Sequence, residues 1–341
     1  MLETDRLAET VNRLTAPHRG ILAADESLPT ITKRFDAVGI ESTEDTRRTY
    51  RSLLVTTPGV GEYISGVIFF EETLDQHTDD GTTLPDAAAK AGIVPGIKVD
   101  KGTIPLTNAP GDKITQGLDG LGERLAAYRD KGARFTKWRN VFSIGAHNPT
   151  PLGVDTNAEV LARYAAIAQE QGFVPIVEPE VLMDGDHDAQ RCAEVTEAVQ
   201  RAVFAALARH RVAFEYMILK PNMIVPGKSQ ARTTAEQVAE QTLRVLRRTV
   251  PAAVPSVNFL SGGQSPEEAT ANLNAMARLS GGQAPWVLSF SYARALQQPP
   301  MELWRGQADN VTAAQKAFLH RAKMNAAARR GEYQPDMESA A

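Results

Sequence analysis

The chain has 341 residues, of which 43% are hydrophobic and 23% are charged, so it can bury a large core without unusual help. Its formal net charge of −4 gives no general electrostatic reason to bind nucleic acid or an anionic membrane. We therefore expect neither nucleic acid nor a membrane among its partners, and any anion must be held by a local site.

Cysteine content and apolar runs set further limits. Cys192 is the only cysteine, which excludes an internal disulfide framework and a cysteine-rich metal site. No apolar run of the sequence reaches membrane-spanning length. Residues 1–14 mix acids and bases, with Leu7, Val11 and Leu14 at helical spacing, which predicts an N-terminal helix and not a secretory signal. We expect a reducing, cytoplasmic setting.

Short apolar, β-rich runs that end in polar residues recur along the chain. They cover residues 20–26, 66–72, 94–100, 134–141, 173–180, 214–222, 256–263 and 286–294. Helical periodicity fills long stretches between and after them, at residues 118–132, 157–171, 188–210 and 310–330. Strands that alternate with helices pair in parallel, and eight such units close into a barrel. The pattern predicts an α/β fold, a (β/α)₈ TIM barrel.

An open, doubly wound sheet is the alternative architecture. It usually brings a glycine-rich phosphate loop after its first strand, and residues 20–27 offer no such pattern. Two helix starts are predicted from capping boxes, one at Ser265 with Glu268 and one at Thr233 with Glu236. We expect a single domain over residues 1–328, including the N-terminal helix, and a flexible tail at 329–341, where hydrophobic periodicity is lost.

Six of the predicted strands carry charged residues inside or at the end of an apolar run. These residues are Asp25, Glu71 or Glu72, Lys98, Lys137 with Arg139, Glu178 with Glu180, and Lys220. Both faces of a parallel barrel strand are buried, so a charge there is costly unless it is paired, neutralised or used in chemistry. The carboxyl ends of barrel strands form the catalytic face. A structural role could explain each charge separately, but their clustering indicates an active site.

Lys220 is the strongest candidate for a nucleophile. Residues 217–219 before it are apolar, so burial should lower the lysine pKa, and a nearby cation such as Lys137 would lower it further. The neutral amine can then attack a ketone. Glu178 and Glu180 share one strand face, so that one can move protons during carbinolamine formation and dehydration while the other tunes its pKa.

A phosphate site is predicted from two loops. Ser261, Gly262 and Gly263 follow the seventh predicted strand, and Arg294 follows the eighth. These two loops form the usual phosphate cradle of barrels. Glycine lets backbone N–H groups approach an anion closely, and arginine adds a forked, charge-assisted contact.

Residues 184–188, with the sequence DGDHD, combine acids and an imidazole that could bind a metal. Aspartate and glycine before a long helix also fit an N-capping turn, and the other five histidines form no ligand-spaced set. We favour the capping interpretation and predict no metal site.

Several longer segments are individually specific. They include GILAADES (20–27), GVIFFEETL (66–74), TQGLDGLGER (115–124), GFVPIVEPEVLMDGDHD (172–188), LKPNM (219–223), FLSGGQS (259–265) and FSYARALQ (290–297). Through these segments, and over nearly its whole length, the chain resembles class I fructose-bisphosphate aldolases, the metal-independent Schiff-base type.

The resemblance implies reversible cleavage of fructose 1,6-bisphosphate to dihydroxyacetone phosphate and glyceraldehyde 3-phosphate, in glycolysis and gluconeogenesis. It implies a sugar phosphate substrate, no metal or other cofactor, and a cytoplasmic homotetramer. The nearer alternative is the same chemistry with a preference for sedoheptulose 1,7-bisphosphate or a ketose 1-phosphate. The remote alternative is a non-catalytic barrel that serves as a scaffold.

The resemblance also implies residue roles. Lys220 forms the Schiff base, Glu178 is the general acid/base, Glu180 is its partner carboxylate, and Asp25 handles the C4 hydroxyl. Lys137 and Lys98 resemble active-site lysines, and Arg139 a substrate contact. The residues expected to hold the C1 phosphate are Ser261, Gly262, Gly263, Ser291 and Arg294, and the one expected to contact the C6 phosphate is Arg34.

Three positions depart from the family pattern. Ala293 replaces a glycine that often precedes the arginine of the eighth strand, which adds a Cβ beside the phosphate. Thr30 stands where a serine is expected and keeps the hydroxyl. The sequence ends at Ala341 without the terminal tyrosine that assists proton exchange at the enamine in animal members. We expect that function to be absent or supplied otherwise.

Overall fold

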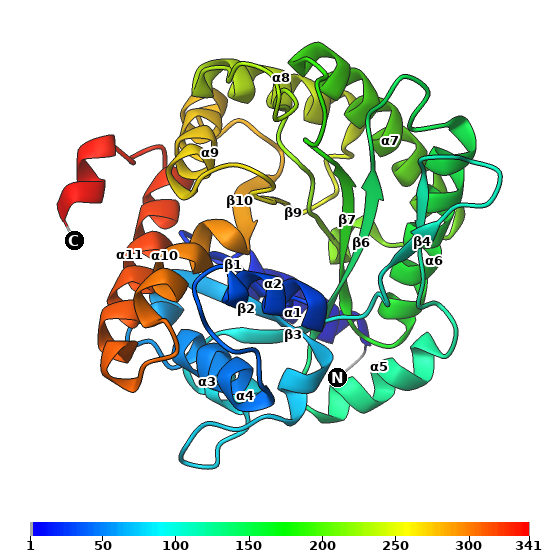
Figure 1. The fold of residues 1–341 in the computed structure, drawn as a ribbon. Helices are drawn as coiled ribbons and strands as arrows, with labels where there is room; N and C mark the ends of the chain where they lie inside the picture. The colour runs from blue at the N-terminus through cyan, green and yellow to red at the C-terminus, as the bar shows by residue number, and fades with distance from the viewer. Residues whose placement is uncertain (1–2, 341) are drawn as a thin grey trace.

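The computed structural model describes residues 3–340 (Figure 1). Eight parallel strands close into a barrel, and helices surround it as an outer layer. The hydrogen-bonded order is β1-β10-β9-β8-β7-β6-β3-β2, which returns to β1 and leaves no open edge. This confirms the predicted (β/α)₈ barrel, and the open-sheet alternative is wrong.

Each of the eight predicted runs overlaps one barrel strand, and β2, β6 and β7 extend one or two residues beyond their runs. The strands are β1 (Gly20–Ala24), β2 (Ile64–Phe69), β3 (Val94–Lys98), β6 (Phe135–Phe142), β7 (Val174–Val181), β8 (Ile218–Leu219), β9 (Ser256–Phe259) and β10 (Val287–Tyr292). Most of them end before the polar residues that close the predicted run, because the chain leaves the barrel there.

Helices follow the strands in alternation. They are α1 (Glu3–Leu14), α2 (Leu28–Asp36), α3 (Glu44–Val55), α4 (Leu84–Lys90), α5 (Leu121–Asp130), α6 (Pro151–Glu170), α7 (Ala189–Arg209), α8 (Ala235–Thr249), α9 (Pro266–Ser280), α10 (Arg294–Trp304) and α11 (Val311–Arg329). None of the helices between residues 3 and 340 is long and apolar enough to cross a membrane.

The two predicted capping boxes have different outcomes. Ser265 caps α9, and its hydroxyl accepts a hydrogen bond from the backbone N–H of Glu268 at 3.1 Å, as predicted. The prediction for α8 is wrong by one residue: Thr234 is the cap, and Gln237 completes the box. A glutamine amide oxygen can reach back to the cap N–H as a carboxylate does, so it competes with the Thr233 and Glu236 pairing.

A hairpin between β3 and β6 was not predicted. Its strands, β4 (Thr103–Pro105) and β5 (Lys113–Thr115), pair in antiparallel fashion outside the barrel. Each has three residues and those of β4 are exposed, so there is no run of alternating burial for the sequence to show.

Helix α1 covers the amino-terminal end of the barrel. Its Leu7, Val11 and Leu14 join one apolar cluster with strand residues that include Ile68 and Phe135. That end is therefore closed by apolar packing, and polar side chains gather at the opposite end.

The described part of the predicted tail packs against the domain. Tyr333 is buried, and its hydroxyl donates to Glu338 Oε1 at 3.0 Å. Glu338 also accepts from the buried Arg321 guanidinium at 2.5 and 2.6 Å. Residues 333–338 therefore make defined contacts with α11, and the flexibility of the tail stays a prediction.

Candidate active site

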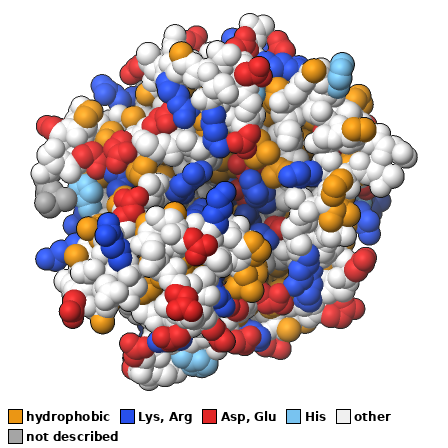
Figure 2. Space-filling model, viewed as in Figure 1, with side chains coloured by type: hydrophobic (Ala, Val, Ile, Leu, Met, Phe, Trp, Pro, Cys, Tyr) orange, Lys and Arg blue, Asp and Glu red, His pale blue; other side chains and the backbone are white. Residues whose placement is uncertain are grey.

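A cavity of about 680 Å³ opens at the carboxyl ends of the barrel strands. Figure 2 shows Lys and Arg side chains gathered around a hollow on this face of the molecule. Every residue predicted for the site lines the cavity: Asp25, Arg34, Lys98, Lys137, Arg139, Glu178, Glu180, Lys220, Ser261, Gly262, Gly263, Ser291 and Arg294.

The period-two alternation of the strands places the central charges inside the barrel. The interior apolar cluster contains Ile21 and Ala23 of β1, Phe135 of β6, Ile176 of β7 and Ile218 of β8. The next residues on the same strand faces are Asp25, Lys137, Glu178 and Lys220. Each of these four interior rows therefore changes from apolar to ionisable toward the open end of the barrel.

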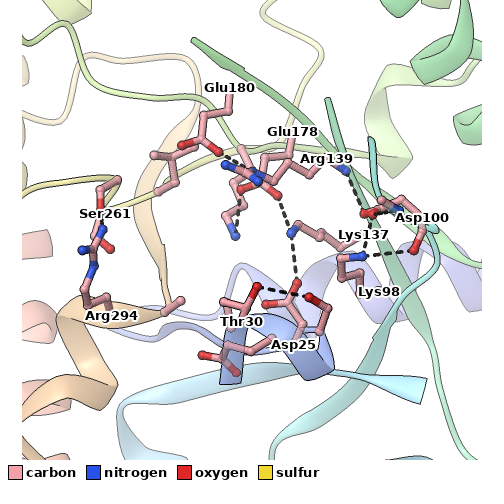
Figure 3. A pocket seen from close by; sticks show the side chains of 18 of the residues that line it. Asp25, Thr30, Lys98, Asp100, Lys137, Arg139, Glu178, Glu180, Ser261 and Arg294 are labelled. Carbon is pink, nitrogen blue, oxygen red and sulfur yellow. Dashed lines mark hydrogen bonds and ion pairs between the residues drawn. The ribbon is translucent and has the colours of Figure 1, made fainter. Parts of the chain in front are cut away.

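These four side chains form a continuous buried series of ion pairs, of which Figure 3 labels Asp25, Lys137 and Glu178. Lys137 Nζ lies 2.9 Å from Asp25 Oδ2 and 2.7 Å from Glu178 Oε2. Lys220 Nζ lies 3.2 Å from Glu178 Oε1. Glu178 therefore contacts one lysine with each carboxylate oxygen, and none of the four side chains is more than 8% exposed.

The charges of these four side chains set one another's protonation states. Burial alone would raise the pKa of Asp25 and of Glu178, but Lys137 and Lys220 outweigh it and lower both values. Burial would lower the pKa of Lys137, yet Asp25 and Glu178 raise it well above its ordinary value. Both carboxylates are therefore ionised at neutral pH, with the Lys137 ammonium between them.

The pKa of Lys220 shifts in the opposite direction from that of Lys137. Burial lowers its pKa, Glu178 partly opposes this, and Lys137 lowers it further. The net shift is downward, as predicted from the apolar residues before it, and it favours the neutral amine that a nucleophile requires.

Glu180 contacts a different partner. Its Oε2 accepts a hydrogen bond from Arg139 Nε. Burial would lower the pKa of Arg139, but Glu180 and Glu178 raise it well above its ordinary value. Arg139 in turn helps to lower the pKa of Glu178. The partner-carboxylate role stays a prediction.

Lys98 is held by a residue that sequence reasoning missed. Its Nζ donates to Asp100 Oδ1 at 2.5 Å, and Asp100 Oδ2 accepts from the backbone N–H of Arg139 at 3.2 Å. Asp100 closes the third predicted run in the segment IKVD, so its place at a strand end was the available signal.

The predicted phosphate residues lie together at one side of the cavity. Figure 3 shows Ser261 and Arg294 beside each other, across from Lys98 and Asp100. Arg294 Nη2 donates to Gly262 O at 2.6 Å, and burial together with Arg34 lowers the pKa of this guanidinium. The buried Ser291 hydroxyl has no hydrogen-bond partner within residues 3–340. A buried, unpaired hydroxyl that lines a cavity is suited to donate to an anion.

The first two loops complete the rim. Arg34 contacts Glu26, a buried carboxylate that also accepts from Gln297 Nε2 at 2.7 Å. Sequence reasoning missed Glu26, although it directly follows Asp25. Thr30 Oγ1 lies 3.1 Å from Ser27 Oγ, so the hydroxyl at position 30 is in the site.

Two other features singled out in the sequence, Glu72 and residues 184–188, have structural roles. Glu72 lies beyond the end of β2, where it pairs with Arg47 and Arg51, so its charge is structural. Asp188 caps α7 by accepting from the backbone N–H of Arg191 at 2.7 Å, which confirms the capping interpretation of residues 184–188.

Comparison with known proteins agrees with this geometry. The family model described as fructose-bisphosphate aldolase class-I matches residues 6–341. The chain belongs to the class I fructose-bisphosphate aldolase family. The chain is 53% identical over 332 residues to the cytosolic fructose-bisphosphate aldolase 6 of Arabidopsis thaliana, covering 97% of this chain and 92% of that one. It is 54% identical over 330 residues to the cytoplasmic isozyme of Spinacia oleracea, with the same coverage.

A bacterial relative and a solved structure extend the comparison. The probable class 1 aldolase of Xanthomonas campestris is 51% identical over 334 residues, which is 97% of this chain and 99% of that one. The solved structure is the Plasmodium falciparum aldolase in complex with TRAP and a small molecule inhibitor. It has a TM-score of 0.95 and 47% identity, over 97% of this chain and 96% of that one. The chain is therefore a lyase with class I fructose-bisphosphate aldolase activity, and the scaffold alternative has no support.

Proposed function

We propose that Lys220 performs this aldol cleavage as the Schiff-base nucleophile, on fructose 1,6-bisphosphate, without a metal or other cofactor. One observation carries the proposal. Lys220 Nζ is buried 3.2 Å from Glu178 Oε1, in a cavity that is also lined by the residues predicted to bind phosphate. An amine with a lowered pKa beside a proton acceptor is the arrangement that nucleophilic attack on a ketone requires.

Imine formation needs three proton transfers. Glu178 accepts a proton from the Lys220 ammonium, the free amine adds to the C2 carbonyl of the open-chain ketose, and a proton moves from the nitrogen of the adduct to its oxygen to give the carbinolamine. Glu178 then returns its proton to the carbinolamine hydroxyl, which leaves as water and yields the protonated imine. Lys137 stabilises the carboxylate form of Glu178 between these steps, because its ammonium lies 2.7 Å from Glu178 Oε2.

Cleavage then needs a base at the C4 hydroxyl. Asp25 is ionised beside Lys137 and can remove this proton. The electron pair of the C3–C4 bond moves into the protonated imine, which becomes an enamine, and glyceraldehyde 3-phosphate leaves. Protonation of the enamine at C3 and hydrolysis of the imine release dihydroxyacetone phosphate and restore the amine. The protonated imine is the electron sink, so no metal is needed for charge stabilisation.

Reductive trapping tests this proposal. Borohydride added with fructose 1,6-bisphosphate or dihydroxyacetone phosphate should inactivate the enzyme, and peptide mapping should find the adduct on Lys220. The Lys220→Ala variant should form no adduct, whereas Lys101→Ala, which changes a half-exposed rim lysine, should form it normally. Absence of the adduct, or loss of activity on chelation, would overturn the mechanism.

Substrate preference needs a separate comparison. We propose fructose 1,6-bisphosphate as the substrate, with sedoheptulose 1,7-bisphosphate and ketose 1-phosphates as the alternatives. Arg34, which lines the cavity, is the residue expected to contact the distal phosphate that ketose 1-phosphates lack. Turnover of the sugars by the wild type and by Arg34→Ala should show a loss for bisphosphates that fructose 1-phosphate does not share. An equal loss for all of them contradicts this assignment.

We also propose a cytoplasmic homotetramer. Family membership supports the tetramer, and the cytosolic names of several relatives support the location, although a chloroplastic aldolase of Arabidopsis thaliana is also 52% identical. Light scattering coupled to size exclusion tests the mass, and cell fractionation tests the location.

A further inference from the structure

Lys228 is a cavity cation to which no role has yet been given. It follows the Pro226-Gly227 pair in the loop between β8 and α8, and both Lys228 and Asp184 line the cavity. Lys228 Nζ lies 2.5 Å from Asp184 Oδ1, and the two side chains are 50% and 64% exposed.

The backbone of Lys228 is held in place by the neighbouring loop. Its N–H donates to Met183 O at 2.8 Å, and the N–H of Gly227 donates to His187 O at 2.8 Å. These bonds join the loop after β8 to the loop after β7, so the base of the Lys228 side chain has a defined position above the cavity.

The stem of Lys228 lies against the phosphate loop. A Cβ placed on Gly263 would lie 2.9 Å from Lys228 Cε and 2.5 Å from Met183 Sδ. Only a residue without a side chain lets the lysine stem and the methionine pass this close. The Lys228 ammonium is therefore within one side-chain rotation of the N–H groups expected to bind phosphate.

Its ion pair is solvated, like that of Lys101 with Glu71 at the rim and unlike those of the cations deeper in the cavity. Lys137, Lys98 and Arg34 are each paired with a carboxylate whose side chain is no more than 8% exposed. Such buried pairs resist exchange, because a carboxylate left alone there is strongly disfavoured. The Lys228 partner Asp184 is solvated, so an arriving phosphate dianion can replace it at little cost.

The nearby Gly263 N–H is similarly available. It donates to Met183 Sδ at 3.0 Å, and a thioether is a weak acceptor. A phosphate oxygen is a much stronger acceptor for this group. The Lys228 ammonium and the Gly263 N–H are thus each paired with a partner that a phosphate can displace.

We propose that Lys228 is a further substrate-binding residue, whose ammonium leaves Asp184 and pairs with the C1 phosphate held by Ser261, Gly263 and Arg294. This inference rests on the proposed function of the site. The C1 phosphate does not change charge during the chemistry, so Lys228 binds the ground state and the transition state alike. Its removal should raise KM and leave kcat nearly unchanged.

Steady-state kinetics of Lys228→Gln provides the test. We expect KM to rise about tenfold for both fructose 1,6-bisphosphate and fructose 1-phosphate, kcat to stay within about twofold, and Lys228→Arg to restore most of the loss. Arg232→Gln is the matched control, since it removes one positive charge from the same loop at a residue that does not line the cavity. It should leave KM within about twofold of the wild type.

Asp184→Asn should change KM in the opposite direction. It removes the carboxylate that competes with phosphate for the Lys228 ammonium, so it should lower KM. A KM for Lys228→Gln that equals that of Arg232→Gln would overturn the proposal. An effect confined to bisphosphates, or a rise in KM with Asp184→Asn, would do so as well. Borohydride trapping on Lys228→Gln separates this from the Schiff-base proposal, because the Lys220 adduct should still form at saturating substrate.

Discussion

Lys137 Nζ and Asp25 Oδ2 lie 2.9 Å apart, although 112 positions separate the two residues along the chain. β1 and β6 are not neighbours in the barrel, so this pair spans its interior. The contact holds Asp25 in its ionised form despite nearly complete burial, because Lys137 and Lys220 outweigh the effect of burial on its pKa.

Asp25→Asn should separate cleavage from imine formation. Loss of the base at the C4 hydroxyl should reduce kcat for cleavage by about 10²- to 10⁴-fold. Lys220 and Glu178 remain, so borohydride should still trap dihydroxyacetone phosphate on Lys220. Asp36→Asn, an exposed change on α2, is the control. If trapping disappears together with cleavage, Asp25 supports the nucleophile and not the C4 proton transfer.

The stability of the enzyme should fall on acidification through Asp25 and Glu178. Their pKa values are lowered below the ordinary 3.8 and 4.5, so the unfolded chain binds more protons than the folded one in this range. Their contribution is complete above the ordinary values and is lost as the pH falls toward the lowered ones. Urea unfolding between pH 7 and pH 2 should show this acid limb, and Asp25→Asn should make it less steep. An unchanged slope in the variant contradicts the assignment.

Glu338→Ala should lower stability without lowering activity. It removes the carboxylate partner of the buried Arg321 and of Tyr333, and partly exposed, charge-assisted bonds of this kind contribute about 1–2 kcal/mol together. Thermal unfolding measures the loss. Among residues 295–340, none lines the cavity, so kcat/KM should stay within about twofold.

The control for this change is Glu332→Ala, which breaks an exposed pair with Arg330. It should shift the free energy of unfolding by less than about 0.5 kcal/mol. Equal shifts in the two variants, or a fall in activity specific to Glu338→Ala, would show that the segment after α11 has another role.

Gly263→Ala should weaken substrate binding through a steric conflict. The added Cβ would lie 2.5 Å from Met183 Sδ, and relief of such a clash costs about 1–3 kcal/mol, or roughly tenfold in KM. Met183→Ala should restore much of the loss when combined with Gly263→Ala and change little alone. Strictly additive effects on KM in this double-mutant cycle would place the conflict elsewhere.

Much of the fold could be predicted because its signals are local and repeated. Every barrel strand overlaps an apolar run bounded by polar residues, and the ionisable residues of four interior rows marked the site. The β4–β5 hairpin gave no such signal, because three-residue strands outside the barrel bury little. The cap of α8 shifted by one residue because Gln237 substitutes for a carboxylate.

Pairings between distant side chains could not be predicted in the same way. Glu180 shares a strand face with Glu178, as alternation requires, yet it contacts Arg139 on β6. The neighbour of a strand residue depends on register between strands, which the sequence of one strand does not contain. Lys228 was overlooked for a related reason: it lies in a polar loop, where a single lysine is unremarkable until the loop beside it is known.

The hydrogen bonds between the loops after β7 and β8 also bear on chimeric aldolases. Three backbone N–H groups of residues 227–229 donate to carbonyl groups of residues 183–187. A graft that imports one loop from a relative and leaves the other would misalign these donors and acceptors beside Lys220. The two loops should therefore be exchanged as one cassette, and recombination breakpoints between residues 189 and 217 should yield fewer active chimeras than breakpoints that keep the pair together.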